Sequence, residues 1–357
     1  MSSTRPPFPL RLLGLALLAA VLLAGLPAAA GAQPFGQFLL LNGPTSGYVL
    51  IPDSPALNPT AAFTFEAWVN VTDADGCSSI AGKDWHLSWW VGICGTTLRS
   101  YLRGSTSQRN GGALNPHEWS HIAVVFDGTN RYHYVNGELV ATFLEPGPLT
   151  TSSAPVEIGS DFSWAHTPAG TIDEVRLWNV ARTQAQIRDG MRGLASAPPG
   201  LVALWPFNFS ANDVVGGHNG TLQGTATYGF NGTGTSCAAA VDSTHLCLLN
   251  RFLISAKYRV GAQSTAEGIA QVAQLTPVNP GSGLFWFFDA SNWEVMVKAL
   301  NGCGLNSRYW LFTAATTNVF YRMEVFDYHS GAQRIYFNYP GPPAPAVTDT
   351  DAFATCP

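Results

Sequence analysis

The amino-acid sequence predicts an all-β protein. Only 11% of its 357 residues are charged, 12% are aromatic, and the chain holds 36 glycines and 24 prolines. Low charge, many turn residues and many large flat side chains are typical of β-sheet domains rich in loops. Apolar and polar residues alternate in several segments, as in FTFEAWVNV at 63–71. A period of two indicates strands with one buried face.

The clearest strand pattern lies at residues 119–140, WSHIAVVFDGTNRYHYVNGELV. Apolar side chains alternate over 122–126, a turn follows, and residues 131–135 run back. Asn136-Gly137 then predicts a two-residue hairpin, because both central positions of a type I′ turn need positive φ. This segment is therefore expected to form a β-meander.

The other strands of the first half follow from shorter alternating runs. We expect them at 37–41 and 48–51, paired as a hairpin, and at 63–71, 79–82, 85–93, 98–103, 156–159, 170–180, 201–208 and 220–222. One short helix is expected after Thr183, since Thr183 and Gln186 have capping-box spacing. Ile187 and Met191 give it one apolar edge, and Gly190 or Gly193 ends it.

Several of these motifs, in this order, resemble one known family. FTFEAWV, WSHIAVVFDG, YVNGELV, GTIDEVRLWNVA and LVALWPF are similar to the laminin-G-like jelly roll of the concanavalin A-like lectin/glucanase superfamily. The resemblance implies that residues 33–225 form a jelly-roll domain, a sandwich of two antiparallel sheets whose first and last strands are adjacent.

The sequence departs from that pattern at two places. Asn42 stands in the first turn, where the family usually has Asp. Arg131 and His133 occupy positions of the central meander that usually carry inward apolar residues. Either the local register differs there, or that face is less buried than usual.

The second half predicts a separate β-sandwich. Residues 226–245 are rich in Gly, Thr, Ser and Ala and are expected to be a linker. In the domain predicted at 246–357, strands are expected at 246–260, 270–275, 283–288, 293–300, 309–313, 319–328 and 334–339. The patterns GLFWFF, NGCG, YWLF and FATCP resemble a C-terminal β module of exported bacterial proteins.

Residues 1–32 have the organisation of a signal peptide. Arg5 and Arg11 precede the apolar run 12–26, and Ala30-Gly31-Ala32 offers a small-residue cleavage site. The alternative is an uncleaved anchor, but the run is shorter than the roughly 20 residues that span a bilayer. We therefore expect a protein that bacteria export, with an extracellular location, and not an integral membrane protein.

Cysteine usage agrees with an oxidising compartment. Six cysteines occur, and no two of them have the CxxC spacing of a zinc site. We expect one bridge in the first half and two in the second, although four cysteines leave the second connectivity open. The expected pairs are Cys77–Cys94, Cys237–Cys247 and Cys303–Cys356.

Charge argues against nucleic acid as a partner. The net charge is −5, and removal of the two leader arginines leaves −7. Only three lysines occur, and the chain has no basic run. A polyanion such as DNA needs a basic surface.

A glycan-binding face is predicted on two neighbouring strands. If 85–93 is one strand, Trp85, Leu87, Trp89, Val91 and Ile93 face the core, which leaves Trp90 outside as a stacking plate beside His86 and Ser88. Arg99, Tyr101 and Arg103 share a face of the next strand. Aromatic rings beside polar groups suit sugars. Trp164 and His166 are candidate rim residues. The alternative is that these rings simply cover the second sheet.

Metal binding and catalysis have weaker signals. Some members of the family have a calcium site, and the resemblance places its counterpart at Asn42 and Asp173. Calcium is therefore a possible ligand, and no cofactor is expected to be required. A retaining glycosidase needs two carboxylates about 5 Å apart. Adjacent Asp173 and Glu174 point to opposite faces of a strand, and Glu157 and Asp161 are not expected to converge. Catalysis is therefore not expected.

The sequence thus predicts a secreted, non-catalytic recognition protein that binds carbohydrate or a cell-surface polymer. A second hypothesis is a structural or adhesion module that contacts extracellular proteins and has no sugar site. A glycoside hydrolase is the third.

Overall fold

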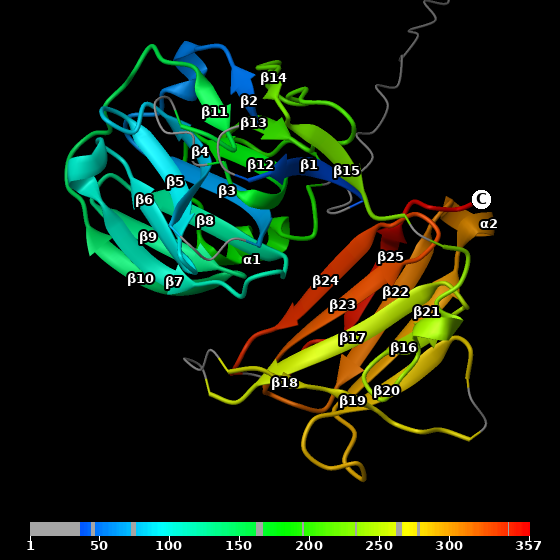
Figure 1. Ribbon diagram of the computed structural model, residues 1–357. Coiled ribbons are helices and arrows are strands. Elements are labelled where there is room, and N and C mark those ends of the chain that lie inside the picture. Colours follow the sequence, from blue (N-terminus) through cyan, green and yellow to red (C-terminus); the bar gives the residue numbers. More distant parts are fainter. Residues whose placement is uncertain are drawn as a thin grey trace, which may run out of the picture.

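The structure is a computed structural model that describes residues 36–43, 47–72, 76–161, 167–194, 196–232, 234–261, 266–276, 279–341 and 343–357. The regular secondary structure of the described chain is almost entirely β-strand and forms two sandwiches (Figure 1). The predicted fold class is confirmed. The expected signal peptide lies outside the described residues. Within the described ranges, no helix has the length and apolarity that crossing a membrane requires.

The first sandwich consists of two antiparallel sheets. Sheet A has the order β10-β9-β8-β3-β12-β1-β15, with β13 beside β12, and sheet B has the order β14-β2-β11-β4-β5-β6-β7. The strands of sheet A are β1 (Gln37–Asn42), β3 (Phe63–Val71), β8 (Ser120–Phe126), β9 (Asn130–Val135), β10 (Glu138–Leu144), β12 (Ala169–Trp178), β13 (Leu201–Trp205) and β15 (Thr227–Phe230). Those of sheet B are β2 (Gly47–Ile51), β4 (Cys77–Lys83), β5 (Trp89–Cys94), β6 (Thr97–Tyr101), β7 (Arg109–Ala113), β11 (Val156–Ile158) and β14 (Thr221–Gly224).

Alternation along the strands builds the core between these sheets. Phe63 and Phe65 of β3 point inward, and their rings lie 5.4 and 5.8 Å from the ring of Trp89 on β5. All three side chains are at most 3% exposed. Burial of one such side chain stabilises the fold by about 1.5–3 kcal/mol.

The central meander forms as predicted. β8 places Ile122, Val124 and Phe126 in the core, and Asn136 and Gly137 adopt φ of 49° and 72°. Arg131 and His133 pair with core residues of β8, face inward and have no exposed surface. The expected register is therefore correct, and the suggestion that this face is less buried is wrong.

The predicted helix is α1 (Gln184–Gly190). Thr183 caps it through the predicted capping box with Gln186. Its Ile187 is fully buried in a small cluster with Ala123, Val125 and Tyr134, on the outer face of sheet A. Short helical turns occur at η1 (Pro55–Leu57), η2 (Ser105–Ser107), η3 (Ala238–Ala240) and α2 (Cys303–Asn306).

Three expected elements of the first sandwich differ from the structure, and the single strand expected at 246–260 is two strands paired as a hairpin. β1 and β2 do not form a hairpin, because they belong to different sheets. The strand expected at 85–93 begins only at Trp89. β15 lies inside the predicted linker and pairs with β1, so the first sandwich continues past residue 225. That pair also confirms the adjacency of first and last strands that the resemblance implied.

The second sandwich packs two five-stranded sheets around its own core. One has the order β16-β17-β23-β24 with β18 beside β17, and the other has the order β19-β20-β21-β22-β25. Their bounds are β16 (Leu246–Leu248), β17 (Phe252–Arg259), β18 (Gly268–Ile269), β19 (Gln271–Val272), β20 (Ser282–Trp286), β21 (Val295–Asn301), β22 (Tyr309–Ala315), β23 (Phe320–Asp327), β24 (Gln333–Asn338) and β25 (Val347–Phe353).

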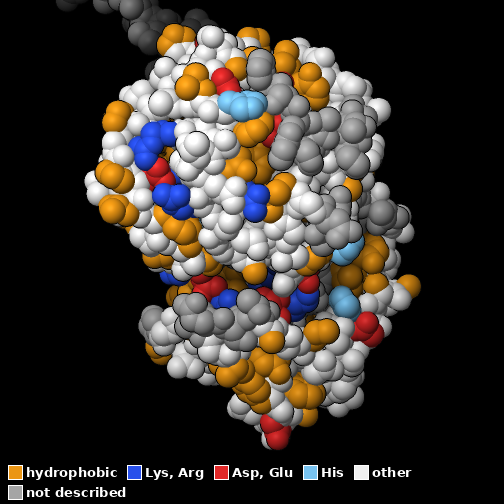
Figure 2. Space-filling model, turned by 60° about the vertical axis from the view of Figure 1, so that its left-hand side comes forward, with side chains coloured by type: hydrophobic (Ala, Val, Ile, Leu, Met, Phe, Trp, Pro, Cys, Tyr) orange, Lys and Arg blue, Asp and Glu red, His pale blue; other side chains and the backbone are white. Residues whose placement is uncertain are grey.

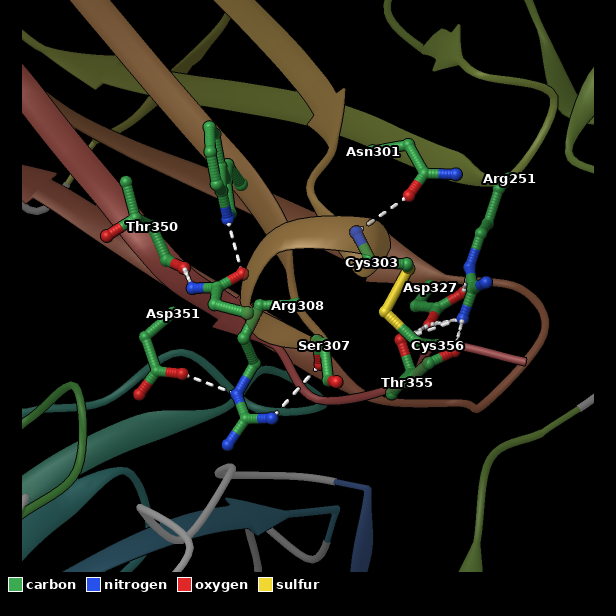
Figure 3. The surroundings of a disulfide bond; sticks show 12 residues. Arg251, Asn301, Cys303, Ser307, Arg308, Asp327, Thr350, Asp351, Thr355 and Cys356 are labelled. Carbon is green, nitrogen blue, oxygen red and sulfur yellow. Dashed lines mark hydrogen bonds and ion pairs between the residues drawn. A yellow bond between two sulfur atoms is a disulfide. The ribbon is translucent and has the colours of Figure 1, made fainter.

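All three predicted disulfides are present: Cys77–Cys94, Cys237–Cys247 and Cys303–Cys356. The last ties the C-terminal end to α2. Beside it, Arg251 donates two hydrogen bonds of 2.6 Å to the carboxylate of Asp327 and further bonds to Thr355 (Figure 3). The end of the chain is thereby held against the second sandwich.

The second sandwich docks on the outer face of sheet A. Trp68 of β3 and Met191 pack with Ile335 and Phe337 of β24. Ion pairs join Lys257 to Glu118 and Arg259 to Glu138 across the same junction, and Figure 2 shows charged side chains along the seam between the two bodies. The outer face of sheet A is therefore covered by α1 and β24, whereas sheet B carries no such layer among the elements described.

Candidate functional site

The candidate site lies on the outer face of sheet B. Val91 and Ile158 point into the core, so their neighbours Trp90 and Glu157 point outward. Glu157 pairs with Gly82, Gly82 with Trp90, and Trp90 with Tyr101. These four residues form one row across β11, β4, β5 and β6.

Trp90 forms a buried floor rather than an exposed plate. Its indole lies over Gly82 and Gly92, where an added Cβ would come within 2.8 and 2.2 Å of the ring. Its Nε1 donates to Ser79 Oγ at 2.8 Å, and its ring stacks on Tyr101 with centroids 4.9 Å apart. Trp90 is 2% exposed and Tyr101 8%. The expectation that both rings are accessible is wrong.

The accessible aromatic residue is Trp85. Asp84 adopts φ of 66° and accepts hydrogen bonds from the N–H groups of Leu87 and Ser88, so residues 84–88 form a turn instead of a strand. This turn brings the Trp85 ring to 6.5 Å from Tyr101, which means that the prediction of Trp85 as core is wrong. The side chain of its neighbour His86 is 57% exposed, and the ring centroids of Trp85 and His86 lie 3.6 Å apart.

The turn also decides where Ser88 points. Ser88 is 1% exposed, and its hydroxyl donates to the carbonyl of Thr150 at 3.0 Å. It therefore holds the turn and is not available to a ligand. The sequence signal that could have revealed this turn is Asp84 itself, because Asp commonly starts a turn by accepting a backbone N–H two residues on, as it does here from His86.

Two predicted arginines line the other side of Tyr101. Arg99 Nε donates to Asn110 Oδ1 at 2.6 Å. Arg103 donates to the carbonyls of Pro146 and Gly147 at 2.8 and 3.2 Å and forms an ion pair with Glu145. Both are partly exposed. The structure thus brings Trp85 and His86 beside Tyr101, whereas Arg99 contacts Asn110 and Arg103 contacts residues 145–147.

A buried polar layer supports β6 from inside the sandwich. His133 Nε2 lies 2.7 Å from Ser100 Oγ, and His133 Nδ1 lies 3.0 Å from the Gly111 carbonyl. Burial lowers the pKa of His133 to about 4, so the ring is neutral, with Nδ1 donating and Nε2 accepting. Arg131 donates to the Ser100 carbonyl at 2.9 Å and to Glu145 at 2.6 Å. These bonds hold Ser100, and with it strand β6, against β9 of sheet A.

The opposite end of the row is acidic. Glu157 is 8% exposed and Asp161 4%. Burial raises the pKa of Glu157, a hydrogen bond from Ser160 lowers it, and the charge of Asp161 raises it further. The charge of Asp161 therefore acts on Glu157. Gly159, between them, has a φ of 87°, and its N–H still bonds to the Ile80 carbonyl of β4 at 2.9 Å.

The predicted metal ligands are not neighbours. Asn42 pairs with Ala169, whereas Asp173 lies four residues further along β12 and pairs with Trp68. Four strand residues span roughly 13 Å. Asp173 is fully buried and accepts the N–H of Glu174 at 2.8 Å, which is a structural role. No group of three or more His, Cys, Asp or Glu residues suited to a metal occurs in the described ranges. Trp164 and His166 lie outside those ranges.

Comparison with known proteins finds a family model that is similar to part of the chain. Residues 43–188 match the model of the family described as the concanavalin A-like lectin/glucanases superfamily. Pappalysin-1 of Mus musculus is 36% identical over 94 residues, and that of Homo sapiens 35%. Each alignment covers 24% of this chain and 6% of the relative, so the chain spans only a small part of those proteins.

Solved structures resemble the chain at low identity. A protein of Bacteroides ovatus proposed to bind carbohydrate has 22% identity and a TM-score of 0.47, with 55% of this chain and 61% of that one covered. An SAP-like pentraxin of Limulus polyphemus has 12% identity and a TM-score of 0.43, with 55% and 95% covered. The first sandwich thus has two antiparallel sheets, as a jelly roll does, and residues 43–188 within it are similar to the concanavalin A-like family.

Proposed function

We propose that this chain is an exported, non-catalytic protein that binds carbohydrate on the outer face of sheet B. The observation that carries the proposal is the aromatic cluster Trp90–Tyr101–Trp85, which is buried at Trp90 and reaches the surface at Trp85. A sugar ring stacks its apolar C–H face on an aromatic ring while its hydroxyls bond to polar groups. His86 supplies such a group beside Trp85.

Other features support the export and the absence of catalysis. All six cysteines are paired, which suits an extracellular compartment and agrees with the predicted leader. The family that matches residues 43–188 includes lectins by its description. Glu157 and Asp161 are almost fully buried, so a glycosidic bond has no access to a position between them.

Site-directed variants on a glycan array test the proposal. The full chain is applied with calcium and again with chelator, beside Trp85→Ala and Trp293→Ala. Trp293 is a matched control because it is 49% exposed on the second sandwich. Removal of a central aromatic contact costs about 2 kcal/mol or more, so Trp85→Ala is expected to weaken binding roughly thirtyfold.

The outcomes separate the hypotheses. Equal binding by the two variants would refute the assignment of the site. A wild-type chain that retains no glycan under either condition would refute carbohydrate binding. Release of reducing ends from a bound polysaccharide, lost in Glu157→Gln, would show a hydrolase.

A contact with proteins is the second candidate, and the edge strand β10 favours it. Leu139, Val140 and Leu144 are 44%, 41% and 68% exposed there. An exposed apolar edge strand can pair with another chain. Leu144→Lys would then abolish capture of an extracellular protein partner and leave the glycan profile unchanged.

A further inference from the structure

The second sandwich has a charged outer face that is docked on the first sandwich. Three cations of β17 and β23 form ion pairs across the junction: Lys257 and Arg322 with Glu118, and Arg259 with Glu138. The opposite outer face belongs to the sheet that contains β20, β21, β22 and β25 (Figure 1). The two faces differ in composition as well as in position.

The opposite face is apolar. Phe285, Val297 and Leu311 belong to the core of the second sandwich, so their neighbours along β20, β21 and β22 point outward. The outward residues of these strands are mostly apolar: Leu284, Trp286, Met296, Leu300, Trp310, Phe312 and Ala314. Met296, on the central strand β21, is 47% exposed, which shows that the face is open to solvent.

Strand pairing makes these side chains neighbours. Met296 pairs with Leu284 on one side and with Ala314 on the other. In the next row, Lys298 pairs with Phe312. The apolar surface is therefore continuous across three strands, and a continuous exposed apolar surface marks a site of interaction.

The ring of Trp310 is held in place on this surface. Trp310 pairs with Leu300, and its ring lies over Gly302, where an added Cβ would come within 2.3 Å of the ring. Its Nε1 donates to Asn306 Oδ1 at 2.8 Å. The ring of Phe312 lies 6.5 Å away between centroids. Two aromatic rings are thus fixed side by side at the surface.

The charge on this face indicates which partner fits it. Lys298 is the only charged residue of β20, β21 and β22, and its partners in the pairing, Ser282 and Phe312, cannot neutralise it. The same face of a second copy would bury this ammonium against apolar side chains, which is costly. An anionic lipid surface attracts clusters of basic residues, and a single lysine is no cluster.

An uncharged polysaccharide satisfies both features of the face. The apolar C–H faces of sugar rings stack on aromatic side chains. Sugar hydroxyls accept hydrogen bonds from an ammonium group, which has three donors and no acceptor. Such a ligand therefore covers the aromatic rings without leaving Lys298 unsatisfied.

We infer that the outer face of β20, β21, β22 and β25 binds an uncharged polysaccharide laid flat across the sheet. Its sugar rings lie against Trp286, Trp310 and Phe312, and its hydroxyls accept from Lys298. The inference goes beyond the proposed function, because this face belongs to the other sandwich and contains no residue of sheet B. Two sites in one chain would hold a polymer more tightly than either site alone.

Depletion of the full chain from solution by three insoluble, uncharged polysaccharides tests the inference. The polymers are cellulose, chitin and β-1,3-glucan, and at least one is expected to bind the wild type. Met296→Glu places a carboxylate on the face, and a sugar ring would have to desolvate it. Trp310→Ala deletes an aromatic contact. Each variant is expected to weaken binding by about tenfold or more.

Controls separate this face from the rest of the molecule. Trp293→Ala removes a tryptophan of similar exposure, 49%, from the loop before β21 and is expected to bind like wild type. Met296→Glu is also compared with its parent in a Trp85→Ala background, where sheet B cannot contribute, and the same loss is expected. Thermal melting confirms that each variant is folded.

Four results would overturn the inference. The first is a wild-type chain that none of the three polymers depletes, and the second is wild-type binding by folded Met296→Glu and Trp310→Ala. A dimer seen in sedimentation and lost in Met296→Glu would assign the face to contact between copies. Binding to phosphatidylcholine vesicles, lost in the same variant, would assign it to a lipid surface. The proposed function would stand in each case if soluble glycans still bind through Trp85.

Discussion

The buried histidine behind the site predicts a specific loss of stability in acid. His133 has a pKa of about 4 in the folded chain, against 6.5 for an ordinary histidine, because burial disfavours the charged ring. As pH falls below 6.5, the unfolded chain takes up this proton first. Stability is therefore fully present above pH 6.5 and is lost between pH 6.5 and pH 4. Linkage gives a loss of about 3 kcal/mol at pH 4.

Comparison with His133→Gln isolates this contribution. A glutamine amide can donate to the Gly111 carbonyl and accept from Ser100, the two bonds that His133 makes, but it does not titrate. Urea unfolding followed by tryptophan fluorescence at pH 7 and pH 4 gives the free energy of unfolding of each protein. The variant should lose about 3 kcal/mol less than wild type over this range.

Two controls make the result decisive. The second buried histidine, His121, is present in both proteins and cancels in the difference. His86→Gln replaces an exposed histidine and is expected to follow wild type. Identical pH profiles for wild type and His133→Gln would refute the assignment of His133 as a buried neutral ring that holds β6.

Two further predictions concern the row on sheet B. Trp90→Ala is expected to lower the free energy of unfolding by about 3–5 kcal/mol, the cost of deleting a large buried ring. Urea unfolding measures this change, and almost no change would show that Trp90 is an exposed ring on the surface. Glu157→Gln is expected to raise stability at pH 7. The pKa of Glu157 is raised by burial, so its ionised form is disfavoured in the folded chain, and this penalty disappears as pH falls below the ordinary pKa of glutamate. Thermal melting at pH 7 and pH 4 checks this difference, and a variant less stable than wild type at pH 7 would contradict it.

Local turn chemistry explains why the meander and helix were predictable. Asn136-Gly137 needs positive φ at both residues, and Thr183 with Gln186 closes a capping box within four residues. Both features depend on neighbours in sequence. The five sequence motifs then identified the jelly roll.

The errors at the site arose where contacts between residues distant in sequence determine which side chains are buried. The alternation in WHLSWWVGI was consistent with one continuous strand from Trp85 to Ile93. In the structure, residues 84–88 form a turn instead, and the strand begins at Trp89. Alternation shows which residues leave the core, and not whether another layer covers them. Gly92, two residues after Trp90 on the same face, was the available signal that a large ring could lie flat.

The junction between the sandwiches had no local signature. Trp68 alternates correctly to the outer face of sheet A, yet its burial depends on Phe337, 6.5 Å away between ring centroids and far along the chain. β15 was missed for a similar reason, since its pairing with β1 crosses most of the first sandwich.

The central claim is that a glycan contacts Trp85 on the outer face of sheet B. The most direct measurement is a titration of the ¹⁵N-labelled chain with the strongest glycan from the array, with the indole N–H signal of Trp85 assigned by Trp85→Phe. The account predicts that this signal shifts with ligand while that of Trp205, which donates to the His218 carbonyl inside the first sandwich, does not. Shifts confined to Trp293 and its neighbours on the second sandwich would contradict it.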